Sequence, residues 1–515
     1  MDTKALRQKI LGLAIRGKLV PQDPNDEPAS VLLERIRAEK QQMVKDGKLK
    51  PKDIKNNTII FVGEDNLHYE KFQDGTVKCI EDEIPFELPE GWEWCRFTSV
   101  TVNRDSERKP ISSANRTNVA KIYDYYGASG KIDKIDKFIF NEKLLLIGED
   151  GANLVTRSKP IAFFAEGQYW VNNHAHCIDS TDKLILEYLC LYINAISLEK
   201  YVTGSAQPKM TQDNMNSILI ALPPYEEQKR LEFQVNHILK TVSTIENEKE
   251  DIVNYIISAK SKILDLAIRG KLVPQDSNDE PASVLLERIR AEKEELIKQG
   301  KIKRDKKESI IFKGEDNSYY EKVGVEIRCI DSEIPFEIPD GWMYERLGNI
   351  CSIARGGSPR PIENYLTDDE NGLNWIKIGD TEQGGKYIYS TKEKIRPEGL
   401  SKTRYVCSGD FLLTNSMSFG RPYILRTNGC IHDGWLVIGG IEIAFHQDYL
   451  YYMLSSSIMY NALSSLAVGS TVKNLKSDSV KSLLVPIPPL AEQACISRQI
   501  ENYFATMLPI ERSLS

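Results

Sequence analysis

The sequence is short of the features that would place a protein in a membrane or in an oxidising compartment. Its 515 residues contain nine cysteines, which are scattered without a single CxxC pair. No apolar run approaches the roughly 20 residues of a membrane-spanning helix, and the opening MDTKALRQKI lacks the apolar stretch of a signal peptide. We therefore expect a cytoplasmic protein with reduced thiols and no membrane partner.

The chain also lacks the motifs of enzymes that use nucleotides or methyl donors. GASGK (127–131) is the nearest approach to a phosphate-binding loop, but its spacing differs from GxxxxGK[ST] and Ile132 follows the lysine. Leu222 precedes Pro-Pro-Tyr, where an amino-methyltransferase needs Asn or Asp, and a leucine side chain cannot hydrogen-bond a target amino group. We expect no cofactor bound by this chain.

Clusters of metal-ligating side chains are equally sparse. Asp65 is followed by Glu70-Lys71, but this adjacent pair lacks the intervening residue of a metal-dependent nuclease site. The run HAHC (174–177) could ligate zinc in principle, yet no second ligand cluster stands elsewhere in the chain. We therefore expect no metal site and no catalysis by this chain alone.

Positive charge is not in excess either. The net charge is −7 at pH 7, which counts against nucleic-acid binding by bulk electrostatics. Residues 101–222 hold 14 Lys and Arg against 14 Asp and Glu, and residues 343–487 hold 15 against 14. Any DNA contact must therefore use locally clustered charge, or a partner must supply the basic surface.

What the chain does contain is a long internal repeat. Residues 9–40 reappear at 262–293 with only two differences among 32 positions. Helical spacing predicts a helix over 30–40 and again over 283–293. Both copies continue through a GEDN turn to EIPFELPEGW or EIPFEIPDGW, whose prolines indicate an extended segment that ends in a core tryptophan. The repeat is therefore a frame carried twice.

A coiled-coil pattern follows Pro224. Apolar residues recur in steps of four and three, which predicts one helix over 225–269, about 65 Å long, with a stripe for a partner helix. The stripe positions are Leu231, Val235, Ile238, Val242, Ile245, Lys249, Ile252, Ile256, Ala259, Ile263 and Leu266. At an offset of 265 the first half of this stripe reappears as Ile496, Ile500, Tyr503, Met507 and Ile510, and at 253 the second half reappears as Leu6, Ile10 and Leu13.

The two chain ends thus share one copy of the central helix between them. We predict that both ends pair with it as antiparallel coiled-coil helices, and that the ends lie within about one helical turn of each other. The molecule would then have circular pseudo-twofold symmetry. The alternative is a tandem duplication whose halves are merely strung together.

Two stretches inside the frame, 97–222 and 347–487, occupy equivalent places yet share almost no sequence. Their short β-branched and aromatic runs, with helices predicted over 184–196 and 447–460, indicate mixed α/β domains and an α+β fold class. The predicted divisions are 1–85 for the N-terminal frame segment, 86–222 for the first variable domain, 223–335 for the central region, 336–487 for the second variable domain and 488–515 for the C-terminal helix.

Several short phrases accompany the repeat, namely the PPxxEQ lead-ins, YGASGKID, GEDGANL and the closing GSAQPKMT (204–211). With them, essentially the whole chain resembles the specificity (S) subunits of type I restriction-modification systems. It departs from the family's closing phrase at Ala206 and at Val472-Lys473.

The resemblance implies two target-recognition domains, each reading half of a bipartite double-stranded DNA site in the major groove. It implies a helical frame that sets the gap and docks methyltransferase (M) subunits, joined by restriction (R) subunits. S-adenosylmethionine, ATP and magnesium would then belong to those partners.

Candidate DNA-binding residues follow from the chemistry of readout. Base edges are read by side chains with paired donors or acceptors, whereas phosphates need cations or amides. In the first variable domain the candidates are Lys131, Arg157, Lys159, Asn172, Asn173, His174 and Lys209. In the second they are Arg355, Asn415, Arg421, Lys473 and Lys476, with Lys209 as the counterpart of the two closing lysines.

The main hypothesis is therefore a non-catalytic DNA sequence-recognition subunit. The first alternative is a structural or adaptor protein whose two variable domains bind proteins, which the acidic net charge slightly favours. Salt-dependent DNA affinity of the assembled complex separates these two hypotheses. A stand-alone nuclease or methylase is the other alternative, and assaying the lone chain with S-adenosylmethionine and magnesium tests it.

Overall fold

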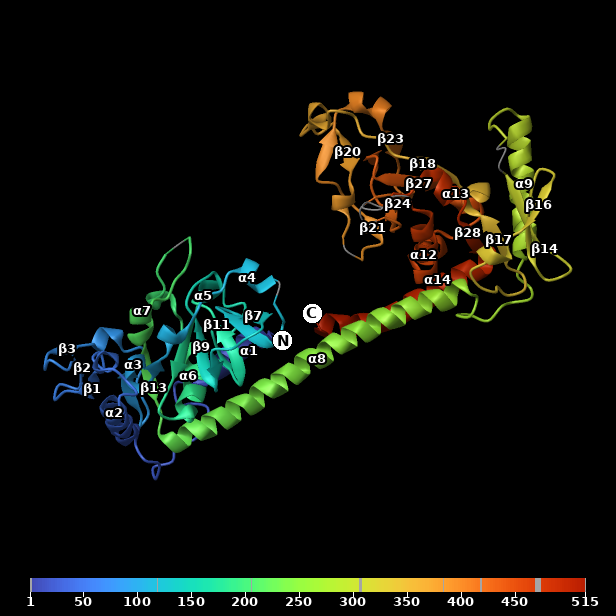
Figure 1. The fold of residues 1–515 in the computed structure, drawn as a ribbon. Helices are drawn as coiled ribbons and strands as arrows, with labels where there is room; N and C mark the ends of the chain where they lie inside the picture. The colour runs from blue at the N-terminus through green and yellow to red at the C-terminus, as the bar shows by residue number, and fades with distance from the viewer. Residues whose placement is uncertain are drawn as a thin grey trace. The chain divides into compact units, whose positions relative to one another are not determined.

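The computed structural model describes residues 2–117, 119–204, 206–304, 308–382, 384–416, 419–467 and 474–514. The chain divides into two compact units, Met1–Glu248 and Lys249–Ser515, and both combine helices with small sheets (Figure 1). The predicted α+β class with two domains and a long helix is confirmed. Along the described parts of the chain, no helix has a stretch long and apolar enough to span a bilayer.

The first unit begins with the frame, which holds α1 (Thr3–Ala14), α2 (Ala29–Lys45), β1 (Ile59–Val62), β2 (His68–Lys71), β3 (Val77–Cys79), β4 (Glu93–Arg96) and α3 (Phe97–Val100). The helix predicted over 30–40 is confirmed within α2. Strands β1, β2 and β3 form one antiparallel sheet. Strand β4 pairs with β13 (Leu219–Leu222), so the strand that enters the variable domain is hydrogen-bonded to the strand that leaves it.

The first variable domain is built on two four-stranded sheets, with strand orders β10-β9-β12-β5 and β7-β6-β11-β8. Its elements are β5 (Val102–Asn103), α4 (Ser113–Thr117), β6 (Tyr123–Gly127), β7 (Gly130–Ile135), β8 (Phe140–Asn141), β9 (Leu144–Gly148), α5 (Asn153–Thr156), β10 (Ala162–Ala165), β11 (Gln168–Val171), β12 (Ala175–Asp179), α6 (Lys183–Ala195) and α7 (Gln212–Asn216). The helix predicted over 184–196 is confirmed as α6.

The apolar run of β9 shows why this domain has a double-sided core. Leu144 and Leu146 join the cluster that includes Tyr169 and Cys177, while Leu145 and Ile147 join the cluster under α6. Because successive side chains on a strand point to opposite faces, a strand covered on both faces must be apolar at every position. Strand β9 is therefore packed on both faces, and this packing fixes the positions of its two ends.

The second unit repeats the frame with α9 (Ala282–Lys298), β14 (Ser309–Lys313), β15 (Tyr319–Val323), β16 (Glu326–Cys329), β17 (Met343–Arg346), α10 (Leu347–Ile350), β28 (Leu484–Ile487) and α14 (Leu490–Leu514). The helix predicted over 283–293 is confirmed within α9. Strands β14, β15 and β16 again form an antiparallel sheet, and β17 again pairs with the closing strand β28.

The second variable domain has two five-stranded sheets, with strand orders β18-β27-β24-β25-β21 and β19-β22-β20-β26-β23. Its elements are β18 (Ser352–Arg355), β19 (Leu366–Thr367), β20 (Leu373–Ile376), β21 (Tyr387–Ile388), β22 (Glu393–Ile395), β23 (Arg404–Val406), β24 (Phe411–Thr414), β25 (Pro422–Leu425), β26 (Gly429–Ile431), β27 (Trp435–Gly439), α11 (Gln447–Ser455), α12 (Ser457–Leu466) and α13 (Ser477–Lys481).

The single helix predicted over 447–460 was wrong, because the chain turns at Ser456. Helix α11 ends at Ser455 and α12 begins at Ser457. The Ser456 hydroxyl accepts a hydrogen bond from the Met459 backbone N–H, which caps the new helix. Serine is a good N-cap residue, and this cap signal was hidden in the run of three serines.

A buried glutamate joins the frame of the first unit to α8 (Tyr225–Ile268). The Trp92 Nε1–H donates to Glu227 Oε2 at 2.9 Å, and Gln22 Nε2–H donates to Glu227 Oε1 at 3.1 Å. Burial raises the pKa of Glu227, against the opposing effect of these two donors. The prediction of a core tryptophan is confirmed, since Trp92 is buried.

The second unit makes the same junction at the start of α14. Trp342 Nε1–H donates to Glu492 Oε2 at 2.8 Å, and Gln275 Nε2–H donates to Glu492 Oε1 at 3.0 Å. Burial raises the pKa of Glu492 as well. The duplication therefore preserves the buried hydrogen bonds as well as the sequence of the frame.

The N-terminal helix lies antiparallel along the first half of α8. Arg7 Nη2 and Glu246 Oε2 form an ion pair at 2.7 Å, while Leu11 and Val235 share a core further along both helices. The predicted pairing of the N-terminal segment with the central helix is confirmed within this unit.

The C-terminal helix lies antiparallel along the second half of α8 in the same way (Figure 1). Lys260 Nζ and Glu511 Oε1 are 2.6 Å apart, while Leu264 and Ile496 share a core. Lys260 aligns with Arg7 at the offset of 253, and Glu511 with Glu246 at 265, so one interhelical ion pair is made twice. The closeness of the two chain ends stays a prediction.

The coiled-coil stripe itself is buried only in part. Ile496 and Ile500 of α14 are fully buried, but Tyr503 is 40% exposed and Phe504 packs inward in its place. Phe504 lies edge-on to Tyr452 with ring centroids 6.0 Å apart. The prediction that Tyr503 faces the partner helix was therefore wrong. Phe504, one position later, faces inward because its ring packs against Tyr452 of the variable domain.

A buried lysine marks a difference between the two frame copies. Lys40 Nζ donates to the carbonyl oxygens of Thr98 at 2.7 Å and Thr101 at 2.9 Å, around the end of α3. Burial lowers the pKa of Lys40 to about 8. Its counterpart Lys293 is less buried and pairs with Glu308 at 2.8 Å.

We expect the two glutamate junctions to contribute equally to stability. Replacing Glu227 or Glu492 with alanine leaves two donors unpaired, one of them a buried indole N–H, and should cost about 1–3 kcal/mol of unfolding free energy each. The matched control Glu226→Ala removes an exposed carboxylate that pairs with Lys229 and should change stability by less than about 0.5 kcal/mol. Denaturant unfolding measures all three; equal effects for Glu226→Ala and Glu227→Ala would contradict the role of the junction.

Lys40 should give the frame a distinctive alkaline response. Because its folded-state pKa is about 8, below the ordinary value of 10.5, the folded chain releases this proton before the unfolded chain does. The stability difference between wild type and Lys40→Met should therefore shift in favour of wild type as the pH rises from 8 to 10.5. Denaturant unfolding of both proteins over this pH range measures the difference, and a difference that stays constant would contradict the effect of burial on Lys40.

Candidate nucleic-acid interface

Four loops of the first variable domain meet beyond the carboxyl end of β9. Glu149 N–H donates to the His174 carbonyl at 2.9 Å, and Gly151 N–H donates to the Pro208 carbonyl at 2.9 Å. A Cβ on Gly148 would lie 2.7 Å from the Ala128 carbonyl, so the β6–β7 turn also packs here. We call this group, residues 127–130, 148–153, 172–174 and 203–210 without the undescribed Ser205, loop cluster 1.

A buried ion network lies beneath loop cluster 1. Glu149 pairs with Arg108 Nη1 at 2.7 Å and with Lys209 Nζ at 3.1 Å. Burial opposes ionisation of Glu149, but the hydrogen bond from Arg108 and the charge of His176 keep the pKa of this carboxyl below its ordinary value. The His176 ring contacts Asp105 Oδ2 at 2.6 Å and the Met210 carbonyl at 3.0 Å. The network therefore fastens the closing loop to strand β12.

The structure brings three predicted residues of the first domain to exposed positions beside acids. His174 Nδ1 lies 2.7 Å from Asp150 Oδ2, and Lys209 is half-exposed above Glu149. Lys131 Nζ lies 2.6 Å from Asp124 Oδ2, and this contact raises the pKa of Lys131. Each of these side chains faces solvent with an acidic neighbour, so an incoming phosphate would have to exchange with that neighbour.

The two predicted asparagines differ in exposure. Asn173 is exposed at the tip of its loop. Asn172 is buried, and its side-chain oxygen accepts a hydrogen bond from the His174 backbone N–H at 2.8 Å. In this conformation Asn172 shapes the loop that carries His174 and does not present its amide to a ligand.

Arg157 and Lys159 turn away from loop cluster 1 toward the frame helices. Both line a cavity of about 500 Å³ between α1, α6 and the first half of α8. The Arg157 guanidinium donates to the Asn194 carbonyl at 3.2 Å, and burial lowers its pKa. The sequence placed these two residues with the other candidates, but the chain folds them against α6.

The second variable domain has an equivalent group of loops, which we call loop cluster 2 (residues 356–360, 415–421, 432–434 and 474–476 without the undescribed 417–418). Asn415 N–H donates to the Gly434 carbonyl at 2.9 Å, and Leu475 N–H donates to the Asn415 carbonyl at 2.8 Å. Gly356 N–H donates to the Trp435 carbonyl at 2.9 Å. Backbone hydrogen bonds therefore tie these loops together as they do in the first domain.

Positive side chains surround Asp433 at loop cluster 2. Arg355 Nε donates to the Asp433 carbonyl at 2.8 Å, and Arg360 Nη2 lies 3.2 Å from the Asp433 carboxylate. Burial opposes ionisation of Asp433, but the Ser358 hydroxyl, the neighbouring His432 and the two arginines keep its pKa below the ordinary value. The guanidinium of Arg360 is 80% exposed, so this loop presents a positive charge to solvent.

The remaining predicted residues of the second domain have different surroundings. Arg421 is exposed at the end of β25 that joins loop cluster 2, and Lys476 is exposed at the start of α13. Asn415 is fully buried, and its side-chain amide donates to the Asp433 carbonyl, so it holds the loop and does not face solvent. Lys473 lies outside the described residues.

Comparison of the two clusters corrects one predicted correspondence. Met210 N–H donates to the Glu149 carbonyl just as Leu475 N–H donates to the Asn415 carbonyl. Glu149 and Asn415 therefore hold the same position, and Lys209 matches Asn474 instead of either closing lysine. The offset of 265 already aligns Lys209 with Asn474, but the prediction matched lysine to lysine instead of following the offset.

Sequence reasoning missed three residues that the structure places at the loop clusters, namely Arg108, Arg360 and Asp433. Arg108 and Asp433 are paired across long sequence separations, with Glu149 and Arg360. Only Arg360 carried a local signal, since it follows the Gly356-Gly357 turn by three residues.

The residues considered for metal chemistry are engaged elsewhere. Asp65 accepts a hydrogen bond from Tyr69, while buried Glu70 pairs with Arg96 at 2.6 Å. Among the residues that the structure describes, no group of three or more His, Cys, Asp or Glu side chains could hold a metal ion.

Comparisons with known proteins identify the family to which the chain belongs. The profile described as "Type I restriction modification DNA specificity domain" matches residues 89–259 and 339–514, which include both loop clusters. The chain is 30% identical to the type I restriction enzyme EcoEI specificity subunit of Escherichia coli, over 97% of this chain and 89% of that one. It is 32% identical to the EcoAI specificity subunit of Escherichia coli, over 68% of this chain and 63% of that one.

A solved structure concerned with complex assembly and conformational transition of the type I R-M system aligns with a TM-score of 0.49. The identity is 16%, and the alignment covers 84% of this chain and 94% of that one. The family profile covers more than half of the present chain, and the EcoEI relative is matched over nearly its whole length. The chain therefore belongs to the family of type I restriction-modification specificity subunits, which recognise DNA targets.

Proposed function

We propose that this chain is a non-catalytic DNA-reading subunit that recognises a bipartite double-stranded site, one half with each variable domain. The observation that carries this proposal is the combination of a common backbone with different side chains at the two loop clusters. Glu149 and Lys209 in the first cluster stand where Asn415 and Asn474 stand in the second. Two readers with one architecture and different chemistry fit a site whose two halves differ.

Each loop cluster offers chemistry for both parts of DNA recognition. Phosphate contacts fix the register of a protein on DNA, and base edges supply the specificity. Arg355, Arg421 and Lys476 are exposed donors in the second domain, and Arg360 joins them as a candidate found in the structure. A guanidinium can donate two parallel hydrogen bonds to guanine, so Arg360 and Arg421 are our first choices for base readout.

In the first domain, the exposed candidates are Lys131, Asn173, His174 and Lys209. Three of them already face carboxylates, so DNA binding would exchange each carboxylate for a phosphate or a base acceptor. Such an exchange lowers the net gain in affinity but rejects ligands that do not place an acceptor correctly. We assign Asn172 and Asn415 the role of shaping their loops and leave Arg157 and Lys159 outside the interface.

The partners follow from the same proposal. Methyltransferase subunits dock on the frame and restriction subunits join them, and these partners bind S-adenosylmethionine, ATP and magnesium. The near-neutral charge of both variable domains supports this assignment, because a partner must then supply much of the non-specific attraction to DNA.

The assembled complex should protect two short stretches of DNA separated by roughly one helical turn. Replacing residues 97–222 with the equivalent domain of a relative should change one protected half-site and leave the other intact. Footprinting and methylation mapping of both complexes measure this. A single contiguous footprint, or a swap that alters both halves, would count against two independent readers.

Arg421 and Arg426 form a matched pair, since they flank opposite ends of β25. Arg426 lies over the Tyr387 ring, 4.4 Å from its centroid, at the end away from loop cluster 2. Arg421→Ala should weaken specific binding by about 1–3 kcal/mol, or lower the salt slope by about one if the contact is to phosphate. Arg426→Ala should leave DNA affinity and its salt dependence unchanged. Equal losses from both variants would rule out loop cluster 2 as the reading edge.

A further inference from the structure

The small sheet of each frame copy has one face that points away from the core. In the first unit, Ile59 pairs with Lys71 and Lys71 with Val77, while Phe61 pairs with Tyr69 and Tyr69 with Cys79. Because side chains directly opposite each other on paired strands share a face, these six residues form one surface. We call it outer face 1.

The second unit repeats this surface in the same register. Ile310 pairs with Lys322 and Lys322 with Ile327, while Phe312 pairs with Tyr320 and Tyr320 with Cys329. We call these six residues outer face 2. Five of the six positions are identical in the two faces, and the sixth is valine in one and isoleucine in the other.

Buried ion pairs on the opposite side of each sheet fix which face is outward. Glu70 pairs with Arg96 at 2.6 Å, and Glu321 pairs with Arg346 at 2.9 Å. Both glutamates are buried on β2 or β15, one residue before the lysine of the outer face. A register slip by one residue would bury that lysine and expose the ion pair, so the outer faces are held outward.

The outer faces expose several apolar side chains to solvent. Ile59, Val77, Ile310 and Ile327 are 41%, 52%, 43% and 58% exposed. The ring of Phe61 stacks on Tyr69 with centroids 5.9 Å apart, and Phe312 stacks on Tyr320 at the same distance. A cluster of exposed apolar and aromatic side chains is the composition of a protein-binding surface.

Two positions next to the outer faces differ between the copies. Val62 in the first sheet corresponds to Lys313 in the second, and Leu67 corresponds to Ser318. At these two positions off the outer face the polarity differs, whereas the GEDN turn beside them and five of the six outer-face positions are identical in the two copies.

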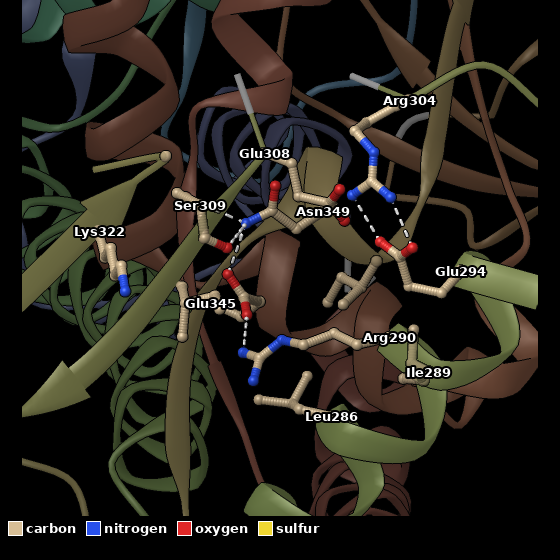
Figure 2. Close-up of a pocket in the computed structure, with 13 residues that line it drawn as sticks. Leu286, Ile289, Arg290, Glu294, Arg304, Glu308, Ser309, Lys322, Glu345 and Asn349 are labelled. Carbon is tan, nitrogen blue, oxygen red and sulfur yellow. Dashed lines mark hydrogen bonds and ion pairs between the residues drawn. The ribbon is translucent and has the colours of Figure 1, made fainter. Parts of the chain in front are cut away.

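One positive charge lies at the centre of each outer face. Lys71 and Lys322 are exposed and flanked on both sides by aliphatic side chains, and neither ammonium group forms an ion pair or hydrogen bond with a residue that the structure describes. Figure 2 shows Lys322 without a marked partner. The nearby carboxylates of Glu70 and Glu321 are committed to arginines on the other face. Each surface therefore fits an apolar segment that carries a carboxylate.

A cavity of about 490 Å³ adjoins outer face 2 (Figure 2). Ile310 and Lys322 of the sheet line it together with Leu286 and Ile289 of α9. Its charged walls are satisfied internally, since Arg290 pairs with Glu345 at 2.9 Å and Glu294 pairs with Arg304 at 2.6 Å. The cavity could therefore accept an apolar side chain next to Lys322.

The first unit has a smaller hollow at the same place. Leu33, Arg37 and Ile59 line it, and they correspond to Leu286, Arg290 and Ile310. Both outer faces therefore continue into a recess between a frame helix and the edge strand of the sheet.

We propose that the two outer faces are equivalent docking surfaces for the methyltransferase subunit, one copy on each. The proposal rests on the proposed function. Two matching surfaces beside divergent variable domains are suited to two copies of one partner. The complementary surface on that subunit carries apolar side chains around an Asp or Glu that pairs with Lys71 or Lys322.

Native cysteines give a direct test without any substitution. Cys79 and Cys329 belong to the outer faces and are exposed, while exposed Cys407 precedes β24 in the second variable domain and serves as an internal control. Alkylation rates are measured by mass spectrometry on the full chain, alone and with methyltransferase subunits. At a free partner concentration about ten times the dissociation constant, Cys79 and Cys329 should react about tenfold more slowly, with Cys407 unchanged.

Charge placed on each face gives a second test. Val77→Glu and Ile327→Glu should each release one methyltransferase subunit, and the double variant should release both, as counted by native mass spectrometry. Ile122→Glu is the matched control, because Ile122 is 59% exposed but belongs to the first variable domain. Unchanged thermal unfolding of the variants shows that their folds are intact.

The outcomes separate this proposal from the proposed function. Two bound methyltransferase subunits with undiminished alkylation of Cys79 and Cys329 would overturn the docking surfaces and leave the DNA-reading role standing. Protection that appears only when restriction subunits are added would overturn the methyltransferase assignment. A wild-type chain that recruits no methyltransferase subunit would overturn both.

Discussion

The arrangement of each unit depends on a single buried carboxylate at the start of a long helix. Glu227 in one unit and Glu492 in the other accept hydrogen bonds from a tryptophan indole and a glutamine amide that come from distant parts of the frame. A buried carboxylate is costly unless its acceptors are filled, so helix, extended segment and repeat loop must all be in place together. This requirement couples the helix that carries the unit to the strands that lead into its variable domain.

On that fixed frame the variable domains differ where a ligand would meet them. The same backbone hydrogen bonds surround Glu149 and Asn415, yet one side chain anchors an ion network and the other donates to a carbonyl. The outer faces of the small sheets behave in the opposite way, because five of their six side chains are identical in the two units. The loops therefore diverge in side-chain chemistry on a common backbone, whereas the exposed sheet faces keep the same side chains.

Much of the frame could be predicted from the sequence because its signals are local or repeated. The stripe after Pro224 predicted α8, and the offsets of 253 and 265 predicted that each chain end pairs with half of it, as Arg7–Glu246 and Lys260–Glu511 show. The candidate site was harder. Arg421 and Arg426 lie five residues apart in one acid-free run, but a four-residue strand between them carries them to opposite ends of a sheet. Nothing local distinguishes exposed Asn173 from buried Asn172.

The sequence by itself therefore determined the duplication, the long helix, the α+β class and the family, because periodicity and repetition survive in a linear string. Only the tertiary structure decided which charged side chains gather at the loops, which asparagines are buried, where a helix breaks at Ser456 and which face of each small sheet stays outward. These features depend on strand register and on contacts between residues far apart in the chain. A shift of strand register by one residue would exchange the inner and outer faces of each small sheet without any change in composition.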